Sequence, residues 1–306
     1  PIAGIQRKSI LKNLSFPFKL LNSLLAAFKI VADFKPDIAI GVGGYASAPT
    51  LYAASAKGVP TLIQEQNSYA GLTNRMLSKR VKKICVAYPN LEKYFPAQKL
   101  VYTGNPVRAD ILDISNKQLE ARNTFGIPAN AKVLLVIGGS LGARTINQCL
   151  ANQYKALEAE GIYTIWQTGK SFADKAVSLF EQNPSELTKA MPFLNQMDLA
   201  YAAADVVISR AGALSISELC LTGKPCILVP SPNVTDDHQT KNAMALVNNN
   251  AALLVKDADV EAKLIETVIS LFNDTELQDN LSNNIKIMGK PNAAFDIVNE
   301  IEALIA

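Results

Sequence analysis

The sequence predicts an α/β protein of two domains, each built on a parallel sheet. Its 306 residues suggest two domains, and 49% hydrophobic against 19% charged residues favours a sizeable core over disorder. Short apolar runs, typical of parallel strands covered on both faces, alternate with segments of helical periodicity. One strand–turn–helix–strand pattern also occurs in both halves. Together these features favour α/β domains.

The expected strands follow this alternation along the chain. Those of the first half are residues 37–41, 60–64, 82–86 and 99–102. Those of the second half are 132–137, 162–166, 190–194, 205–209, 225–229 and 251–255. Helices are expected between them, for example 18–34 and 237–248, and three helical patterns follow Asp257. The polar stretch 113–126 is expected to be the linker between the domains.

The repeated unit begins at Asp37 (DIAIGVGGYAS) and at Asp205 (DVVISRAGALS). In both copies a glycine, a serine, a helix, a Gly-x-Pro and an apolar strand follow in that order, although all βαβ units share some of this likeness. The first half has fewer expected strands than the second, and it opens in what looks like a connecting segment. We therefore expect about 60 residues, two βα units at roughly 30 residues each, to be missing upstream.

Charge is distributed unevenly between the two halves. Residues 1–112 contain 15 Lys and Arg against 5 Asp and Glu, whereas residues 113–306 contain 15 against 22. A basic first half suggests an anionic partner, such as a membrane surface, a pyrophosphate or nucleic acid. The four cysteines form no CxxC pair and there is one histidine, which argues against a zinc site and fits a reducing cytoplasm. No apolar run is long enough to predict a membrane span.

The first motif with chemical potential is GGSLGAR, residues 138–144, which follows an expected strand and opens a helix. Glycines let the backbone approach a phosphate, the helix start presents free N–H groups, and Ser140 adds a hydroxyl. A dinucleotide fingerprint would require an acidic residue about 20 positions later. The next strand ends in Trp-Gln-Thr at 166–168, so the pattern disfavours a nicotinamide site.

The second motif is SRAGALSISE, residues 209–218, where small residues form a turn after a strand. The following N–H groups could surround a diphosphate, and the Glu218 carboxylate could accept hydrogen bonds from both ribose hydroxyls. Ser215-x-x-Glu218 also has the spacing of a capping box. The local sequence leaves these two interpretations equal.

Further polar segments follow expected strands. TDDHQTKNA, residues 235–243, contains the single histidine, His238, beside Gln239, and its Asp236–Asp237 pair is expected to cap a helix. QEQNSYAGLTNR, residues 64–75, and TGNPVR, residues 103–108, are rich in amides, and Arg108 is a candidate phosphate or carboxylate clamp.

Two patterns have competing interpretations. DAD, residues 257–259, resembles a metal–nucleotide motif but lies just before a helix, where aspartates are ordinary caps. The loop GVGGYAS from Gly41, with Glu65 as a ribose acid, would make a dinucleotide site. It supports an alternative function, that of a dinucleotide-binding Rossmann protein or an oxidoreductase.

In their order along residues 43–243, these motifs resemble the MurG family, the N-acetylglucosaminyltransferases that complete lipid II. The resemblance implies a GT-B fold, two Rossmann-like parallel-sheet domains facing a cleft, with the N-terminal domain incomplete here. It implies an acceptor- and membrane-facing domain over residues 1–113, joined by the C-terminal helix 291–306, and a UDP-sugar domain over 114–290.

The resemblance also implies a set of donor-binding residues. They are Asn67, Arg108, Ser140, Leu194, Ala213, Leu214, Ser215, Ile216, Ser217, Glu218 and Gln239. This set favours ribose binding by Glu218. The chain departs from the family at Gln64, where many members have histidine, and it lacks the GGTGGH loop whose histidine is a candidate base. The catalytic residues therefore stay unassigned, with the base expected on the missing segment.

The implied activity is that of an inverting hexosyltransferase. It would move N-acetylglucosamine from UDP-N-acetylglucosamine to undecaprenyl-linked lipid I, forming lipid II for peptidoglycan, with no metal or other cofactor and no nucleic-acid partner. The protein would be peripheral on the cytoplasmic face of the bacterial inner membrane, an anionic surface. Phe16 and Phe18, among lysines, are expected to insert there, the leucines of 20–28 to face the core, and the basic cluster 79–83 to lie in the same half.

Overall fold

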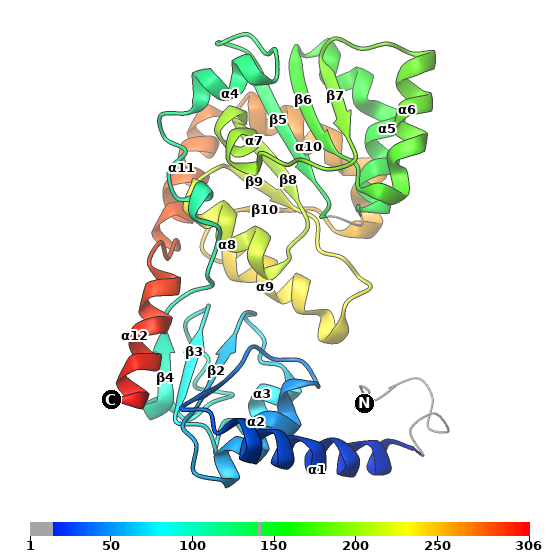
Figure 1. The fold of residues 1–306 in the computed structure, drawn as a ribbon. Helices are drawn as coiled ribbons and strands as arrows, with labels where there is room; N and C mark the ends of the chain where they lie inside the picture. The colour runs from blue at the N-terminus through cyan, green and yellow to red at the C-terminus, as the bar shows by residue number, and fades with distance from the viewer. Residues whose placement is uncertain (1–14, 140–141) are drawn as a thin grey trace. The chain divides into compact units, whose positions relative to one another are not determined.

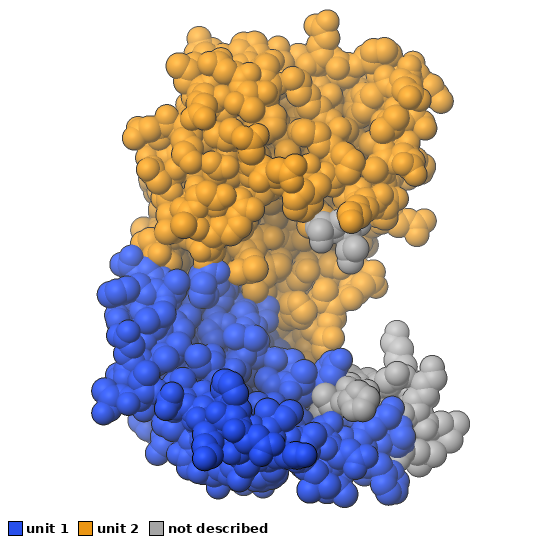
Figure 2. All heavy atoms as spheres, viewed as in Figure 1, with its two compact units in different colours: residues 1–106, 292–306 blue, residues 107–291 orange. Residues whose placement is uncertain are grey.

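The computed structural model describes residues 15–139 and 142–306 (Figure 1). The chain forms two compact units, residues 1–106 with 292–306, and residues 107–291 (Figure 2). This division falls before residue 107, whereas the sequence led us to expect it after residue 113. The difference arises because the short helix η3 (Ala109–Ile111) packs against helices α7 and α8 of the second unit.

The first unit is built on a four-stranded parallel sheet in the order β1-β2-β3-β4. Its strands are β1 (Ala39–Gly41), β2 (Thr61–Glu65), β3 (Lys83–Val86) and β4 (Leu100–Tyr102). Its helices are α1 (Phe16–Phe34), α2 (Ser47–Ala56), α3 (Leu72–Leu77) and α12 (Ala293–Ile305). The last of these belongs to the end of the chain but packs on this sheet. Ile297 meets Leu62 and Cys85 there, and Lys83 forms a 2.9 Å ion pair with Glu300.

Helix α1 buries a different face from the one expected. Its buried residues are Ala27 and Val31, which pack on Ala53 and Ala54 of α2. Leu21 and Leu25 are 56% and 61% exposed, so the expectation that the leucines of this helix all face the core is wrong. Small side chains on α2 allow the two helices to approach closely, and this turns the leucines outward. Within the described part of the chain, no helix is long and apolar enough to cross a membrane.

The second unit contains a six-stranded sheet, also wholly parallel, in the order β10-β9-β8-β5-β6-β7. Its strands are β5 (Lys132–Ile137), β6 (Ile162–Gln167), β7 (Thr188–Met191), β8 (Val206–Ser209), β9 (Cys226–Leu228) and β10 (Leu253–Leu254). Its helices are α4 (Gln118–Thr124), α5 (Arg144–Ala159), α6 (Ala173–Gln182), α7 (Met197–Ala203), α8 (Ala213–Thr222), α9 (His238–Val247), α10 (Val260–Phe272) and α11 (Thr275–Ile287). Both units are thus Rossmann-like, and the direction of strand addition reverses between β5 and β8.

Every expected strand is present, with one clear displacement. Strand β7 covers 188–191 rather than 190–194, because Pro192 has no N–H to continue the pairing with β6. The repeated unit is confirmed as β1–α2–β2 and β8–α8–β9, each a parallel pair around one helix. Its serines differ in position, since Ser47 begins α2 whereas Ser215 lies inside α8.

The stretch 113–126 is not a simple linker, because it contains helix α4, which packs against α7. Arg122 of this helix is 4% exposed and binds both carboxylate oxygens of Asp205, at 2.8 and 3.0 Å. Its guanidinium also donates to the carbonyls of Ala203 and Ala129. Asp205 in turn accepts from the backbone N–H of Val133, at 2.8 Å, so one buried arginine joins α4 to the start of two central strands.

We predict that Arg122→Met destabilises the second unit by about 3 kcal/mol. Removing one partner of a buried ion pair leaves Asp205 without its counter-charge. Lys263→Met is the matched control, since its pair with Asp259 is exposed at both ends and should cost less than ~0.5 kcal/mol. The only tryptophan, Trp166, is fully buried in this unit, so its fluorescence during urea unfolding reports the change directly. Equal urea midpoints for the two variants would contradict a stabilising role for the ion pair between Arg122 and Asp205.

Candidate functional site

Two glycine-containing turns lie at the point where the order of the second sheet reverses. The turn at 138–144 follows β5, and the turn at 210–213 follows β8. The last residues of these strands, Ile137 and Ser209, are paired in register. In doubly wound sheets, ligands bind outside the carboxyl ends of the strands at such a reversal. The topology therefore brings both sequence motifs to the expected ligand position.

The turn after β5 is shaped by the close approach of Gly142 to β6. A Cβ on Gly142 would lie 2.3 Å from the carbonyl oxygen of Thr168, and its φ of +80° is unfavourable for other residues. That carbonyl accepts a 2.6 Å hydrogen bond from Asn147, whose own amide oxygen accepts from the indole of Trp166. Helix α5 begins directly afterwards, at Arg144. Ser140 lies outside the described residues.

The turn after β8 leads into α8, which begins at Ala213 after the N-cap Gly212. Ser215 is therefore inside the helix and Glu218 lies further along it, so the capping-box interpretation is wrong. No side chain in the described part of the chain caps this helix start. The early N–H groups of Ala213, Leu214 and Ser215 consequently remain able to meet an anion. Ile216 is buried, and the Ser217 hydroxyl donates to the carbonyl of Ala213.

Glu218 is held by a tyrosine from the neighbouring helix. The hydroxyl of Tyr201, on α7, donates to Oε2 of Glu218 at 3.0 Å. Burial raises the pKa of the Glu218 carboxyl, and the negative Asp110 adds to this, while the hydroxyl of Tyr201 and the positive Arg108 lower it. Among the described residues, none donates to the second oxygen, Oε1. One carboxylate oxygen is thus held by Tyr201, and the other could accept from a ligand.

Arg108 lies beside this carboxylate, but its guanidinium is engaged. Nε and Nη2 bind the two oxygens of Asp110 at 3.1 and 2.7 Å, in a pair that is nearly half exposed. An exposed pair of this kind is weak and exchanges readily. Arg108 can therefore act as an anion clamp if a ligand replaces Asp110.

A network that the sequence analysis missed crosses the reversal point. Arg210, the residue after β8, binds Asp257 and donates from Nη2 to the hydroxyl of Thr145 on α5, at 2.9 Å. Thr145 also donates to Asp257, at 2.6 Å. Asp257 was expected to be a helix cap, and this is wrong, since its side chain accepts from Arg210 and Thr145. Arg210 was visible within the motif SRAGALSISE, but its partners come from distant segments.

Gln239 and Leu194 are both tied to neighbouring loops. Oε1 of Gln239 accepts from the backbone N–H of Ser231 at 2.8 Å and so holds the proline loop after β9. The N–H of Leu194 donates to Oε1 of Gln167 at 3.2 Å, which fixes the loop after β7.

The Asp236–Asp237 pair does not cap as expected. Both residues have positive φ, and Asp237 accepts from the hydroxyl of Thr240 rather than from a helix N–H. His238, next along, has Nδ1 2.7 Å from the carbonyl oxygen of Thr235.

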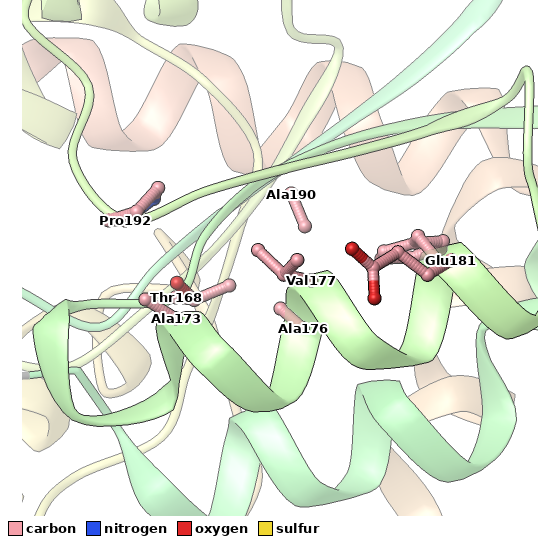
Figure 3. Close-up of a pocket in the computed structure, with 8 residues that line it drawn as sticks. Thr168, Ala173, Ala176, Val177, Glu181, Ala190 and Pro192 are labelled. Atoms are coloured by element: carbon pink, nitrogen blue, oxygen red, sulfur yellow. The ribbon is translucent and has the colours of Figure 1, made fainter.

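Two hollows lie on the second unit. One, of about 520 Å³, is at the carboxyl ends of β9 and β10, lined by Pro230, Pro232, Asp237, Thr240, Leu254, Lys256, Asp257 and Ala258. The other, of about 320 Å³, lies between α6 and the edge strand β7, with Thr168 and Pro192 towards one end and Glu181 towards the other (Figure 3). The second hollow is mainly apolar, and neither hollow is lined by any of the implied donor residues that the structure describes. In the described part of the chain, no cluster of three metal-binding side chains occurs.

Asn67 belongs to the first unit, where a buried carboxylate organises its loop. Glu65 is 2% exposed and accepts from the backbone of Asn67 at 3.1 Å, from that of Gly71 at 3.0 Å, and from the side chain of Asn74 at 2.8 Å. Both oxygens of Glu65 are therefore used within the protein. This disfavours the alternative function, which required Glu65 to bind a cofactor ribose.

Amide side chains connect the carboxyl ends of the strands in the first unit. Gln64 donates to Oδ1 of Asn105 at 2.7 Å. The side-chain amide of Asn105 donates to the backbone carbonyl of Gln66. The side-chain amide of Gln66 in turn donates to the backbone carbonyl of Val42. The loops after β1, β2 and β4 are thereby held together.

The chain matches two family models and close relatives. The model for the glycosyltransferase family 28 C-terminal domain matches residues 133–297, and that for the N-terminal domain matches residues 1–86. A protein of Cytophaga hutchinsonii is 53% identical over 99% of this chain and 81% of its own length. One of Flavobacterium psychrophilum is 50% identical over 99% and 82%. Both are named UDP-N-acetylglucosamine–N-acetylmuramyl-(pentapeptide) pyrophosphoryl-undecaprenol N-acetylglucosamine transferase.

Solved structures agree on the fold. MurG of Acinetobacter baumannii superposes with a TM-score of 0.78 at 31% identity, covering 99% of this chain and 84% of that one. UDP-GlcNAc 2-epimerase of Neisseria meningitidis, solved with UDP-GlcNAc, reaches 0.65 at 18% identity over 98% and 84%, and shows likeness of fold alone. The fold is GT-B, with two Rossmann-like α/β domains.

We predict that Gly142→Ala destabilises the second unit by more than ~2 kcal/mol, since it adds a backbone clash to the strain of positive φ. Gly139→Ala is the matched control: its φ is +79°, and no atom of the described residues lies within 4 Å of the added Cβ. Strain alone should cost about 1 kcal/mol there. Urea unfolding followed by Trp166 fluorescence measures both, and a larger loss in the Gly139 variant would refute the prediction.

Proposed function

This chain belongs to the MurG family of glycosyltransferase family 28, and we propose that it transfers N-acetylglucosamine from UDP-N-acetylglucosamine to undecaprenyl-linked lipid I, which yields lipid II. The observation that carries the donor site is the pair of glycine turns at the reversal between β5 and β8, with Glu218 on the helix that follows. The first unit would bind the acceptor and face the membrane.

The donor diphosphate would lie against the starts of α5 and α8. Free N–H groups and the positive ends of both helices favour an anion there, and Ser140 would add a hydroxyl. Arg210 adds a nearby positive charge that Asp257 and Thr145 hold in place. In the transition state the departing UDP gains negative charge, which these fixed groups would stabilise without rearrangement. No metal or other cofactor enters this proposal.

The remaining donor groups would meet the other implied residues. Oε1 of Glu218 would accept from the ribose hydroxyls, and the backbone of Leu194 would contact the uracil. The amide of Gln239, oriented by its bond to Ser231, would contact the sugar. Arg108 would exchange Asp110 for the diphosphate.

The transfer would be one displacement with inversion. A hydroxyl oxygen of the acceptor attacks the anomeric carbon, the bond from that carbon to the UDP oxygen breaks, and UDP keeps the electron pair. The hydroxyl proton passes to a general base, a role that we assign to none of the described residues.

Association with an anionic membrane would use helix α1. Phe18, Leu21 and Leu25 share one face of this helix and are each more than half exposed. Phe16 is half-buried, so Phe18 rather than Phe16 is the better anchor. Arg80 of the basic cluster stacks on Tyr52, which in turn contacts Phe28 of α1. Exposed apolar residues next to basic ones favour shallow insertion among anionic headgroups.

We predict that Glu218→Gln weakens binding of UDP-N-acetylglucosamine about 10-fold, since a charged acceptor makes the stronger hydrogen bonds. Burial raises the pKa of Glu218, and only the ionised carboxylate accepts from both hydroxyls. Affinity of the native protein should therefore fall as pH decreases through that raised pKa, starting at a higher pH than an ordinary glutamate would give. The esterified diphosphate of the donor does not titrate in this range, so calorimetry between pH 8 and 5 isolates the carboxyl. A native pH profile that matches the variant's would remove Glu218 from the ribose site.

We predict that the protein sediments with anionic but not with neutral liposomes, and that high salt releases it. Phe18→Ser should lower the bound fraction several-fold while leaving UDP affinity unchanged, because insertion of the ring is lost. Phe295→Ser, on α12 of the same unit and 67% exposed, is the matched control and should bind as the native protein does. Equal loss in both variants would place the membrane contact elsewhere.

A further inference from the structure

We infer that Tyr201 is a positioning residue for the donor site, whose hydroxyl sets the Glu218 carboxylate in the orientation that recognises the ribose 2′-hydroxyl. This inference rests on the proposed function, because it requires that Glu218 bind ribose. It adds a residue from α7, outside every motif that the sequence pointed to.

The geometry around Tyr201 leaves little freedom. Its side chain is fully buried on α7, and its hydroxyl donates to Oε2 of Glu218 at 3.0 Å. Burial and the adjacent carboxylate raise the pKa of the Tyr201 hydroxyl far above its usual value, so it stays protonated and acts as a donor. This donor restricts the orientation of the carboxylate and occupies Oε2, so Oε1 is the oxygen available to a ligand.

Without this hydrogen bond, the Glu218 carboxylate would change its protonation state or its orientation. A largely buried carboxylate with no protein donor on either oxygen is costly and would take up a proton or turn towards Arg108. Either change would leave the carboxylate misplaced for a ribose hydroxyl. The hydroxyl of Tyr201 thus acts before the ligand arrives, and its contribution should appear as selectivity for ribose rather than as overall affinity.

The test compares UDP with 2′-deoxy-UDP by calorimetry at pH 8. We expect Tyr201→Phe, which keeps the ring and its packing, to lower UDP affinity 5- to 10-fold. The affinity for 2′-deoxy-UDP should fall only about 2- to 3-fold, because its 3′-hydroxyl alone remains to contact Glu218. In a Glu218→Gln background the same substitution should add less than a 2-fold change. Tyr154→Phe is the matched control, a buried tyrosine of α5 whose ring packs on Phe180, and it should alter neither ligand.

The outcomes distinguish failure of the proposed ribose site at Glu218 from failure of the positioning role of Tyr201. If Glu218→Gln keeps full preference for UDP over 2′-deoxy-UDP, the proposed ribose site fails. If Glu218→Gln loses that preference but Tyr201→Phe retains it, the positioning role alone is overturned. If Tyr201→Phe lowers the affinity for both nucleotides equally, the positioning role is also overturned, because such a loss indicates general damage to the structure.

Trp166 fluorescence checks that each variant is folded. Should Tyr201→Phe not fold, Glu218→Asp provides the second test, because it keeps Tyr201 and the charge but withdraws the carboxylate from the hydroxyl. The same selective loss of UDP affinity is then expected, and a native preference for UDP would overturn the inference.

Discussion

The proposed donor site depends on one topological constraint, the pairing of β5 with β8. These strands are neighbours in the sheet although β6 and β7 separate them in the chain. The connections that leave them run in opposite directions, so the loops above them diverge and leave room for a ligand. Both glycine turns stand at that position. A phosphate can approach them because glycine presents backbone without side chains and because two helices begin there.

Buried polar side chains hold these loops in shape. Glu65 in the first unit and Arg210 in the second each make several hydrogen bonds to a loop that follows a strand. Burying a charge is costly unless it is paired, so these contacts form only when each loop has its native conformation. The side chains of Glu65 and Arg210 are thus held by protein contacts, and groups held in place in this way stabilise a developing charge most effectively.

The two units are suited to different chemistry. The second presents helix starts, a held arginine and a carboxylate with one available oxygen, which together match a sugar nucleotide. The first combines an amide network with an exposed apolar helix face and nearby basic residues, which would suit the proposed lipid-linked acceptor at a surface. Gln64 contributes to that network through its hydrogen bond to Asn105.

The sequence by itself determined the strands, the parallel α/β class, the repeated unit and the family, because apolar runs and glycine turns are local signals. It also placed Glu218 and Gly142 in motifs. Only the tertiary structure excluded the capping box for Glu218, since that depends on where α8 begins, and only the tertiary structure brought Tyr201 of another helix to its carboxylate. The same holds for Arg210 with Asp257, for the buried Arg122 in a supposed linker, and for the outward leucines of α1. These contacts join residues far apart in the chain, and no local pattern encodes which distant partner a buried polar or apolar side chain will meet.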